Sequence, residues 1–350
     1  MKKLNLKKTT RQNFLTYGLV IIAFAILQTM ISSGSITSSL KGMLVPICAY
    51  VVMAISLNLT VGVLGELSLG HAGFMSVGAF TGVTAAVALQ NLIPAAPIRL
   101  ALGMIVGAIF AAIAGFLIGI PVLRLKGDYL AIVTLAFGEI IKSIFNNLYV
   151  GIDNNGFHFS MLSDKTNLAE GGKLIIGGPM GVGGIQKIST FTAGFLLVMV
   201  TLVVVFNLVN SRSGRAIMAI RDNRIAAESV GINVTKYKMI AFVTSAALAG
   251  AAGALFAMNY STIAANKFDF NTSILILVFV VLGGLGNMLG SIVAATALTI
   301  LPEALRQFAD YRMLVYAVVL ILVMLFTNNP KLKQFFNQFK THNMRGKEAE

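Results

Sequence analysis

The sequence predicts an all-α integral membrane protein with about ten transmembrane helices. The chain has 350 residues, of which 57% are hydrophobic and 11% are charged, and its mean hydropathy is +0.83. A soluble domain carries about a quarter charged residues. Apolar runs of about twenty residues, the length that crosses a bilayer as a helix, recur along the chain. We therefore expect residues 1–350 to form a single transmembrane domain.

Ten apolar runs are separated by polar breaks that are mostly short. The first run is too long for the apolar part of a signal peptide, and no A-x-A cleavage site follows it, so it is expected to persist as a helix. An even number of spans places both termini on the same side of the membrane. The predicted spans are residues 14–31, 43–63, 69–90, 99–122, 129–149, 191–210, 239–258, 271–289, 290–305 and 313–327.

The basic residues predict the orientation of these spans. Eighteen of the 27 Lys and Arg residues lie on the same side as the N-terminus, including the basic tail 328–350, and eight lie on the other side. The positive-inside rule therefore places both termini in the cytoplasm. The net charge of +14 is assigned to these loops and to contact with anionic membrane lipid. No nucleic-acid partner is expected, because no basic stretch is interleaved with stacking aromatic residues.

The segment 57–80, LNLTVGVLGELSLGHAGFMSVGAF, does not have the composition of an uninterrupted spanning helix. It contains five glycines as well as polar and charged side chains, and Gly weakens a helix and lets other backbone approach closely. Buried polar groups and broken helices are tolerated at membrane depth where they line a cavity. We predict that the segment lines or gates a passage; for His71, a structural role and contact with the transported solute both stay open. The residues of this segment that we assign to the passage are Asn58, Glu66, Ser68 and His71.

Two Gly-rich breaks interrupt the apolar pattern, one at Leu64–Ser68 and one around Gly283–Gly290. Each can be a tight turn or a discontinuous helix within the membrane. Their sequences, LGELSLG and LGNMLG, resemble each other. Transporters often contain inverted repeats with interrupted helices at matching positions, so an internal repeat and a chance resemblance both stay open.

Glu139 is an acidic residue expected within the fifth span. Lys142 follows it by three residues, which places the two side chains on the same helix face. They can form an ion pair, or Glu139 can face a water-filled interior and contribute to the passage.

Two loops are too long to be simple connections. The outer loop, residues 151–190, ends in IIGGPMGVGGI (175–185), which cannot form a regular helix, and we expect it to act as a docking surface or partial lid. The inner loop, residues 211–238, is expected to break at Ser213-Gly214 and then to form an amphipathic helix from Arg215 to Val230. Gly231 would end this helix. The helix can lie on the membrane surface or insert into a cytosolic partner. Its predicted apolar face contains Ile217, Ile220, Ala227 and Val230.

The sequence gives no basis for enzyme chemistry in this chain. It has one cysteine, Cys48, and three well-separated histidines, so no catalytic set, metal site or cofactor site is expected. The phosphate-binding pattern G-x-x-x-x-G-K-[ST] does not occur. Proton- or sodium-coupled transport usually needs carboxylates near the middle of spans, and these are scarce. Energy is therefore expected from a separate ATPase that docks on the inner loop.

Five segments together resemble the integral permeases of branched-chain amino acid ABC importers, and RLKGDYLAIVTLAFGE marks the M-type permease. The resemblance covers about residues 40–330. In this sequence Ile176 and Met180 stand where relatives often have Thr and Asn in an outer T-G-G-P-N-G motif. The segments are LNLTVGVLGELSLGHAGFMSVGAF, PVLRLKGDYLAIVTLAFGEI, GGPMGV, GRAIMAIRDNRIAAESVGI and VLGGLGNMLGS.

The resemblance implies a permease subunit that forms a translocation path for branched-chain amino acids in a bacterial plasma membrane. Its implied partners are a second homologous permease, two cytosolic ABC ATPase subunits that bind ATP, and an extracytoplasmic solute-binding protein. It also implies that Arg221, Glu228 and Gly231 lie in the coupling helix that engages an ATPase. Transport of another small neutral solute, such as urea, amides or other amino acids, and self-sufficient secondary transport are the alternatives.

Overall fold

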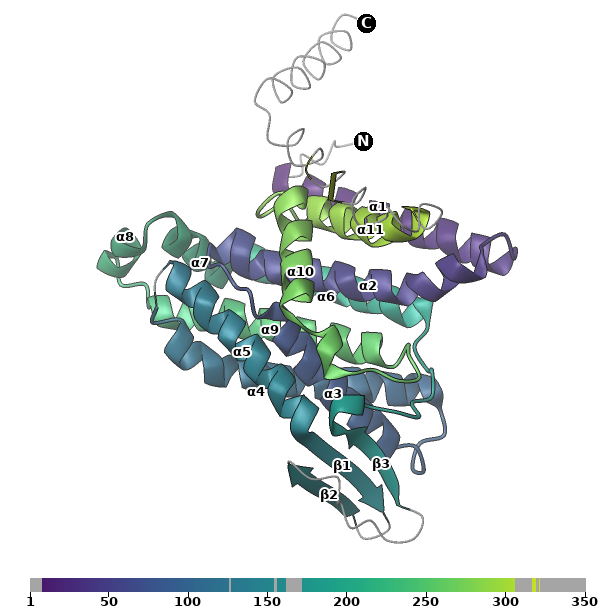
Figure 1. Cartoon of the computed structure of the whole chain (residues 1–350). Coiled ribbons are helices and arrows are strands. Elements are labelled where there is room, and N and C mark those ends of the chain that lie inside the picture. The colour runs from purple at the N-terminus through teal and green to yellow at the C-terminus, as the bar shows by residue number, and fades with distance from the viewer. Residues whose placement is uncertain are drawn as a thin grey trace, which may run out of the picture. The chain divides into compact units, whose positions relative to one another are not determined.

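The structure is a computed structural model, and it describes residues 8–125, 127–153, 156–161, 172–305, 317–318 and 321. The chain divides into two compact units, residues 1–295 and 296–350. In the described residues the helices are α1 (Lys8–Ser32), α2 (Ser38–Asn58), α3 (His71–Ala88), α4 (Ala96–Val122), α5 (Asp128–Asn147), α6 (Phe191–Asn210), α7 (Arg212–Asp222), α8 (Arg224–Ser229), α9 (Val234–Ala257), α10 (Phe270–Gly283) and α11 (Met288–Ala304) (Figure 1).

Eight helical segments of the described residues are long and apolar enough to cross a membrane. They correspond to the first eight predicted spans, which confirms the all-α membrane fold. The eighth ends earlier than predicted, at Gly283 instead of residue 289, because residues 284–287 form a turn. The ninth predicted span corresponds to α11, which has 17 residues and is therefore shorter than the eight candidate spans. The tenth predicted span, 313–327, falls almost wholly outside the described residues.

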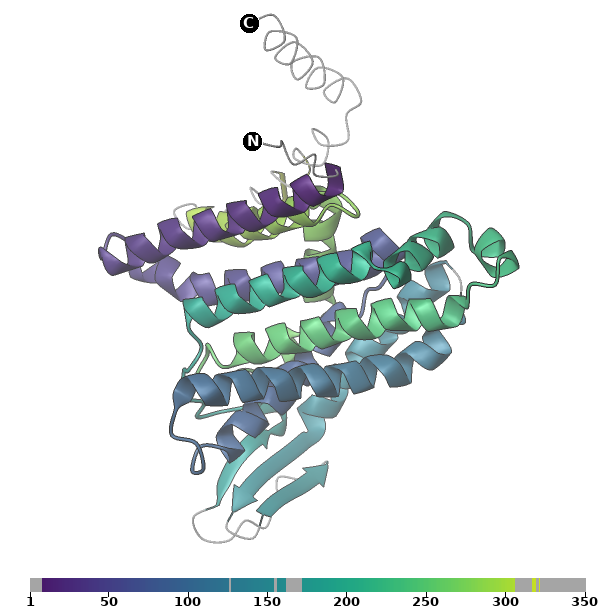
Figure 2. The same cartoon turned by 180° about the vertical axis from the view of Figure 1, so that it is seen from behind.

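Helices α3, α4 and α9 pack closely because glycines replace side chains where their backbones meet. Gly78 lies against the carbonyl of Gly250, and Gly107 lies against the carbonyls of both. Figure 2 shows α4 and α9 running side by side. Small residues allow this backbone approach between membrane helices, where apolar lipid gives little hydrophobic driving force. The three helices therefore form the tightly packed centre of the first unit.

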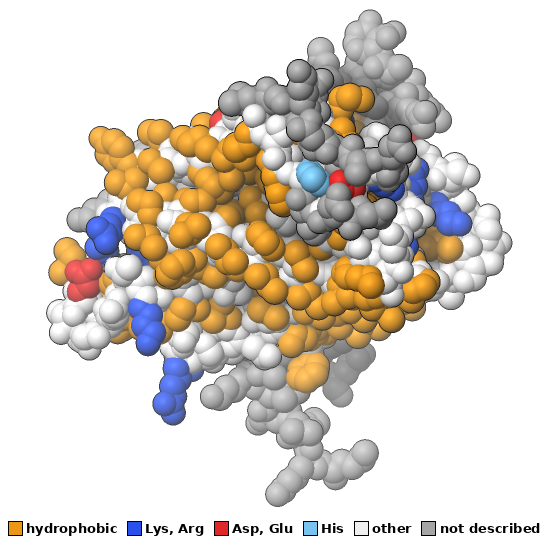
Figure 3. Space-filling model, turned by 90° about the horizontal axis from the view of Figure 1, so that it is seen from below, with side chains coloured by type: hydrophobic (Ala, Val, Ile, Leu, Met, Phe, Trp, Pro, Cys, Tyr) orange, Lys and Arg blue, Asp and Glu red, His pale blue; other side chains and the backbone are white. Residues whose placement is uncertain are grey.

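The outward surface of α4 is apolar. Figure 3 shows a broad hydrophobic face on this side of the molecule, with Lys and Arg side chains at its edges. Such a surface is expected to contact lipid, since it would be costly to expose to water. The α4 side chains that are at least half exposed include Ile98, Ile105, Ile109, Phe110, Ile113, Phe116 and Leu117.

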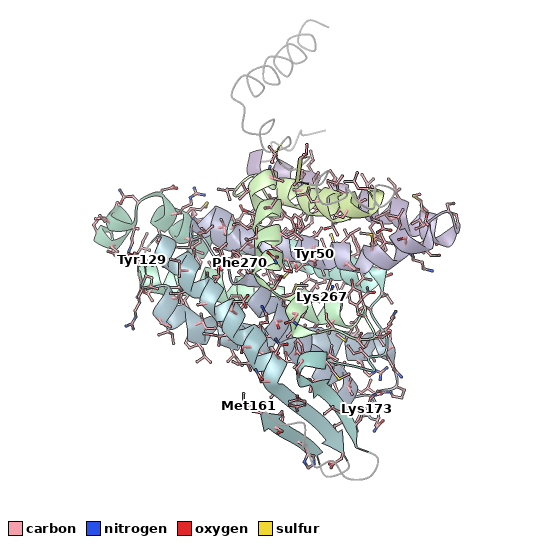
Figure 4. All side chains as sticks on the ribbon, viewed as in Figure 1. Tyr50, Tyr129, Met161, Lys173, Lys267 and Phe270 are labelled. Carbon is pink, nitrogen blue, oxygen red and sulfur yellow. The ribbon has the colours of Figure 1, made fainter. Side chains whose placement is uncertain are left out.

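A small antiparallel sheet, which no pattern in the sequence predicts, follows α5. Its strands are β1 (Leu148–Asp153), β2 (Gly156–Met161) and β3 (Lys173–Gly177), in the order β2-β1-β3. Strand β1 begins at Leu148, whereas the fifth span was predicted to continue as a helix to residue 149. Figure 4 labels Tyr129 near the start of α5, Met161 at the end of β2 and Lys173 at the start of β3. Within the described residues of the predicted outer loop, 151–153, 156–161 and 173–177 thus form strands.

The glycine-rich end of the outer loop, residues 175–185, forms no α-helix, as the sequence predicts. A 3-10 turn, η2 (Gly178–Met180), follows β3. The backbone of Val182 then pairs with Ile263, which precedes a second 3-10 turn, η3 (Ala265–Lys267). Gly181 has φ of 70° and lies against the Ile263 carbonyl, so a side chain would not fit there. These contacts fix the loop to the segment before α10.

We predict that Gly250→Leu destabilises the protein, because the new side chain would overlap Ala111 and the backbone of Gly107. Overpacking of a close-packed site costs about 1–3 kcal/mol, and more where backbone must move. The measurement is the thermal unfolding midpoint of the purified protein in detergent. Gly42→Leu is the control, since nothing lies within 4 Å of a β-carbon there. Equal midpoints for the two variants would contradict the packing described above.

Candidate translocation and coupling site

The first Gly-rich break is a discontinuous helix. Helix α2 passes into a π-helical turn, η1 (Leu59–Leu64), which Gly65 ends with φ of 82°. Residues 65–70 are irregular, and α3 begins at His71. A π-helical turn widens the helix and is common at functional sites. Because the break occupies 65–70, the predicted third span starts two residues later than expected.

The second break lies directly against the first. The Asn58 amide nitrogen donates a hydrogen bond to the Ser291 hydroxyl (2.9 Å), and the Gly286 amide donates to the Asn58 side-chain oxygen (2.8 Å). A β-carbon at Gly62 would overlap the Gly286 backbone. Asn58 is fully buried, and buried polar groups need hydrogen-bond partners. Both ends of its side chain find these partners at or next to the second break. Asn58 therefore joins two segments that are more than 220 residues apart in the sequence.

Glu66 forms an ion pair with Lys238, which lies in the first turns of α9. The Lys238 side chain is 4% exposed and the Glu66 side chain is 16% exposed. A buried charge is tolerated when an opposite charge and hydrogen bonds compensate it. Lys238 therefore neutralises the carboxylate of the first break. From the sequence, Lys238 is only one of the 18 basic residues predicted on the cytoplasmic side, and no pattern predicts its pair with Glu66.

His71 and Ser68 are both buried, but they differ in their partners. The His71 Nε2 atom lies 2.8 Å from the Ser56 hydroxyl, and Ser245 donates to the Ser56 carbonyl (2.6 Å). This network ties the start of α3 to α2 and α9, and it favours the structural role for His71. The Ser68 hydroxyl is buried without a hydrogen-bond partner among the described groups.

Glu139 lies apart from this cluster, on α5. Its carboxylate pairs with Lys142 at 2.7 Å, which is the ion pair that the spacing indicates. The Glu139 side chain is 41% exposed and the Lys142 side chain is 25% exposed. Glu139 therefore does not join Asn58 and Glu66 at the two breaks.

The inner loop folds as two helices, and the prediction of one helix from Arg215 to Val230 is wrong. Helix α7 ends at Asp222 and α8 begins at Arg224, because Asn223 is extended (φ −156°) and its side chain caps the Ala226 amide. A local cap of this kind competes with a continuous helix. The expected break at Ser213-Gly214 is also wrong, since Ser211 caps α7 and the helix runs through both residues.

The apolar face of the inner loop is largely as predicted. Ile217, Ile220 and Ala227 are buried, whereas Val230 is 75% exposed and does not belong to that face. Gly231 has φ of 82° and follows the end of α8, which confirms its predicted role as a helix stop. Glu228 is exposed and pairs with Arg224 at 3.0 Å.

Arg221, at the end of α7, reaches the first break. Its Nη1 atom donates to the Gly62 carbonyl (3.1 Å), and its aliphatic part covers Gly65. The last carbonyls of a helix lack intrahelical partners, and the C-terminal end of the helix dipole favours a cation. Arg221 thus caps the interrupted end of η1. The family resemblance implies that Arg221 lies in the coupling helix, and no sequence pattern predicts its contact with Gly62.

A cavity of about 540 Å³ borders the junction of the two breaks. None of the five predicted path residues (Asn58, Glu66, Ser68, His71 and Glu139) lines it. Its lining combines four hydrogen-bonding side chains with an apolar surface. It is lined by Asn13, Leu15, Thr16, Val63, Phe206, Val209, Asn210, Gly286, Asn287, Met288 and Leu289.

The family profile described as branched-chain amino acid transport system, permease component, matches residues 39–324 of this chain. The chain belongs to this permease family. It is 35% identical over 327 residues to the high-affinity branched-chain amino acid transport system permease protein LivM of Salmonella typhimurium, covering 91% of this chain and 74% of that protein. It is 34% identical over 346 residues to LivM of Escherichia coli K12, covering 96% and 78%.

Permeases described for other solutes are more distant relatives. The fructose import permease FruG of Bifidobacterium longum is 27% identical over 244 residues, covering 67% of each chain. No solved structure matches the chain. Family membership and the eight apolar helices identify the chain as a multi-pass membrane protein of an ABC-type permease family.

We predict that Asn58→Ala lowers the stability of the permease, because the buried Ser291 hydroxyl and the Gly286 amide each lose a partner. An unsatisfied buried polar group costs about 1–3 kcal/mol. Thermal unfolding in detergent measures the loss. Asn91→Ala is the matched control, since Asn91 is exposed. A midpoint for Asn58→Ala equal to that of the control would argue against the bridge.

Proposed function

We propose that this chain is the permease subunit of an ABC importer for branched-chain amino acids. The observation that carries the proposal is its 34–35% identity to two LivM permeases over more than nine-tenths of this chain. In the proposed assembly a second homologous permease completes the translocation path. Two cytosolic ATPase subunits supply energy, and an extracytoplasmic binding protein delivers the solute. Both termini and the α7–α8 segment then face the cytoplasm.

The arrangement of the inner loop supports docking of a separate ATPase. Helices α7 and α8 lie together at one end of the helix bundle (Figure 1). Their inward side is buried, whereas Ile225 is 80% exposed, Val230 is 75% exposed and Glu228 is exposed beside them. Exposed apolar side chains next to a charge are typical of a protein contact. We assign Glu228 and Gly231 to this contact.

The acidic residues of the spans support an external energy source. The eight candidate spans contain two acidic residues. Glu139 pairs with Lys142, and Asp269 caps the first turn of α10. A proton- or sodium-coupled secondary transporter usually needs carboxylates that exchange ions during transport. We therefore favour population shift by ATP-bound partners, which stabilise one opening of the path.

A second candidate function is import of a sugar or nucleoside. It is favoured by the matches to FruG, to the ribose import permease RbsC of Escherichia coli (27% identical over 323 residues) and to the nucleoside permease NupC of Lactococcus lactis (23% over 280 residues). These identities are lower than those to the LivM permeases, so we rank this function second.

Reconstitution into proteoliposomes tests the function directly. With its partner permease, ATPase subunits and binding protein, the chain should support ATP-dependent uptake of leucine, isoleucine or valine. Alone it should be inert, because its sequence carries no ATP-binding pattern of the P-loop type. Uptake of ribose or fructose instead would support the second candidate. Solute flux by the isolated chain would refute an ABC subunit.

We predict that Glu228→Leu and Gly231→Val abolish uptake while the protein still reaches the membrane. The first places an apolar side chain in the proposed ATPase contact. The second forces a side chain into the left-handed conformation, which costs about 1–2 kcal/mol. Uptake in cells and the amount of permease in isolated membranes are measured together. Lys41→Leu, at an exposed site in α2, is the control; undiminished uptake by both inner-loop variants would exclude this contact.

A further inference from the structure

Two cations of the inner loop, one before α8 and one after it, contact the same interrupted helix end. Arg221, at the end of α7, donates to the Gly62 carbonyl at 3.1 Å. Lys238, in the first turns of α9, pairs with Glu66. The two acceptors are four residues apart in sequence, on either side of Gly65. The loop between the two cations, residues 222–237, includes α8 and is therefore fastened to the first break at both of its ends.

Both contacts fit the electrostatics of this helix end. The segment 38–64 is a continuous helical run that ends at Gly65. Its last carbonyls are unpaired within the helix, and its dipole makes this end negative. Glu66 adds a full negative charge immediately after it. A guanidinium and an ammonium group are thus held where the potential favours cations, and hydrogen bonds to charged groups are stronger than neutral ones.

The first break cannot move independently of the second. Gly62, whose carbonyl accepts from Arg221, has no space for a β-carbon because the Gly286 backbone lies against it. Asn58, one helical turn earlier, holds both Gly286 and Ser291 through its side chain. A displacement of the η1 turn therefore changes the contacts at residues 286–291 as well. Packed elements of this kind switch between discrete arrangements because they do not deform continuously.

We propose that Arg221 and Lys238 are positioning residues that convert movement of the α7–α8 segment into a coordinated rearrangement of the two helix breaks. The side of the segment that carries Ile225, Glu228 and Val230 is exposed and free to contact a partner, whereas Arg221 and Lys238 bind the break. This inference rests on the proposed function, since a partner ATPase must move the segment. It assigns Arg221 a role within the permease. It also assigns Lys238 and Glu66 a positioning role that they fulfil together as an ion pair.

The test uses the complete transporter in proteoliposomes and measures solute uptake and ATP hydrolysis in the same sample. The variants are Arg221→Met, which keeps the aliphatic part over Gly65 but removes the donor, and Glu66→Gln with Lys238→Gln, which removes both charges together. Matched controls are Arg212→Met on α7 and Lys236→Met on α9, whose side chains are exposed. We expect uptake per ATP hydrolysed to fall about tenfold in each test variant, because each loses its charge-assisted contact with the first break. Arg221→Met also removes the pair with Asp222, but that pair lies within α7. The controls should keep the wild-type ratio.

A spin label at Leu67 follows the break itself. Leu67 lies in the irregular segment and is 37% exposed, and Cys48→Ala removes the single native cysteine. We expect ATP to change the mobility of the label in the wild-type complex but not in Arg221→Met, although hydrolysis continues. Arg221→Lys, which retains a cationic donor, should restore part of the response.

Three results would overturn the inference. The first is an unchanged ratio of uptake to hydrolysis in both test variants. The second is a normal ATP response at Leu67 in Arg221→Met. The third is loss of ATPase assembly in the test variants, because Arg221 and Lys238 would then serve docking. Failure of the proposed function is seen separately, as a wild-type complex without ATP-dependent uptake.

Discussion

The contact between two interrupted helices is the constraint on which the rest of the structure depends. Gly62 and Gly286 meet without side chains between them, and Asn58 supplies the hydrogen bonds that the second break needs at this point. Each break leaves backbone groups without helical partners, which is costly within a membrane. The structure pairs two of these groups, the Gly286 amide with Asn58 and the Gly62 carbonyl with Arg221.

This arrangement explains why the polar residues of the segment 57–80 have different roles. Asn58 joins the breaks, Glu66 is neutralised by Lys238, and His71 completes a network with Ser56. Their common feature in the sequence, a polar residue in an apolar run, does not distinguish these roles. The roles are distinguished only by the partners, which lie in α9, α2, α11 and the turn before α11.

The inner loop is connected to the breaks by charge and to its own core by apolar packing. Ile220 and Ala227 pack with Val234, so α7, α8 and the start of α9 form one cluster. A segment with its own small core can move as a unit, which an amphipathic helix lying alone on the membrane surface would not do. Arg221 and Lys238 lie at the boundary between this cluster and the transmembrane helices.

The sequence by itself determined the membrane fold, eight of the spans, the positions of both breaks, the Glu139–Lys142 pair and the helix stop at Gly231. These features depend on hydropathy, helical spacing and glycine conformation, which are local properties of the chain. The sheet after α5, the division of the inner loop at Asn223 and the partners of Asn58, Glu66 and Arg221 were decided by the tertiary structure. They depend on which distant groups approach one another, such as Gly286 and Lys238, and a local pattern does not encode that proximity.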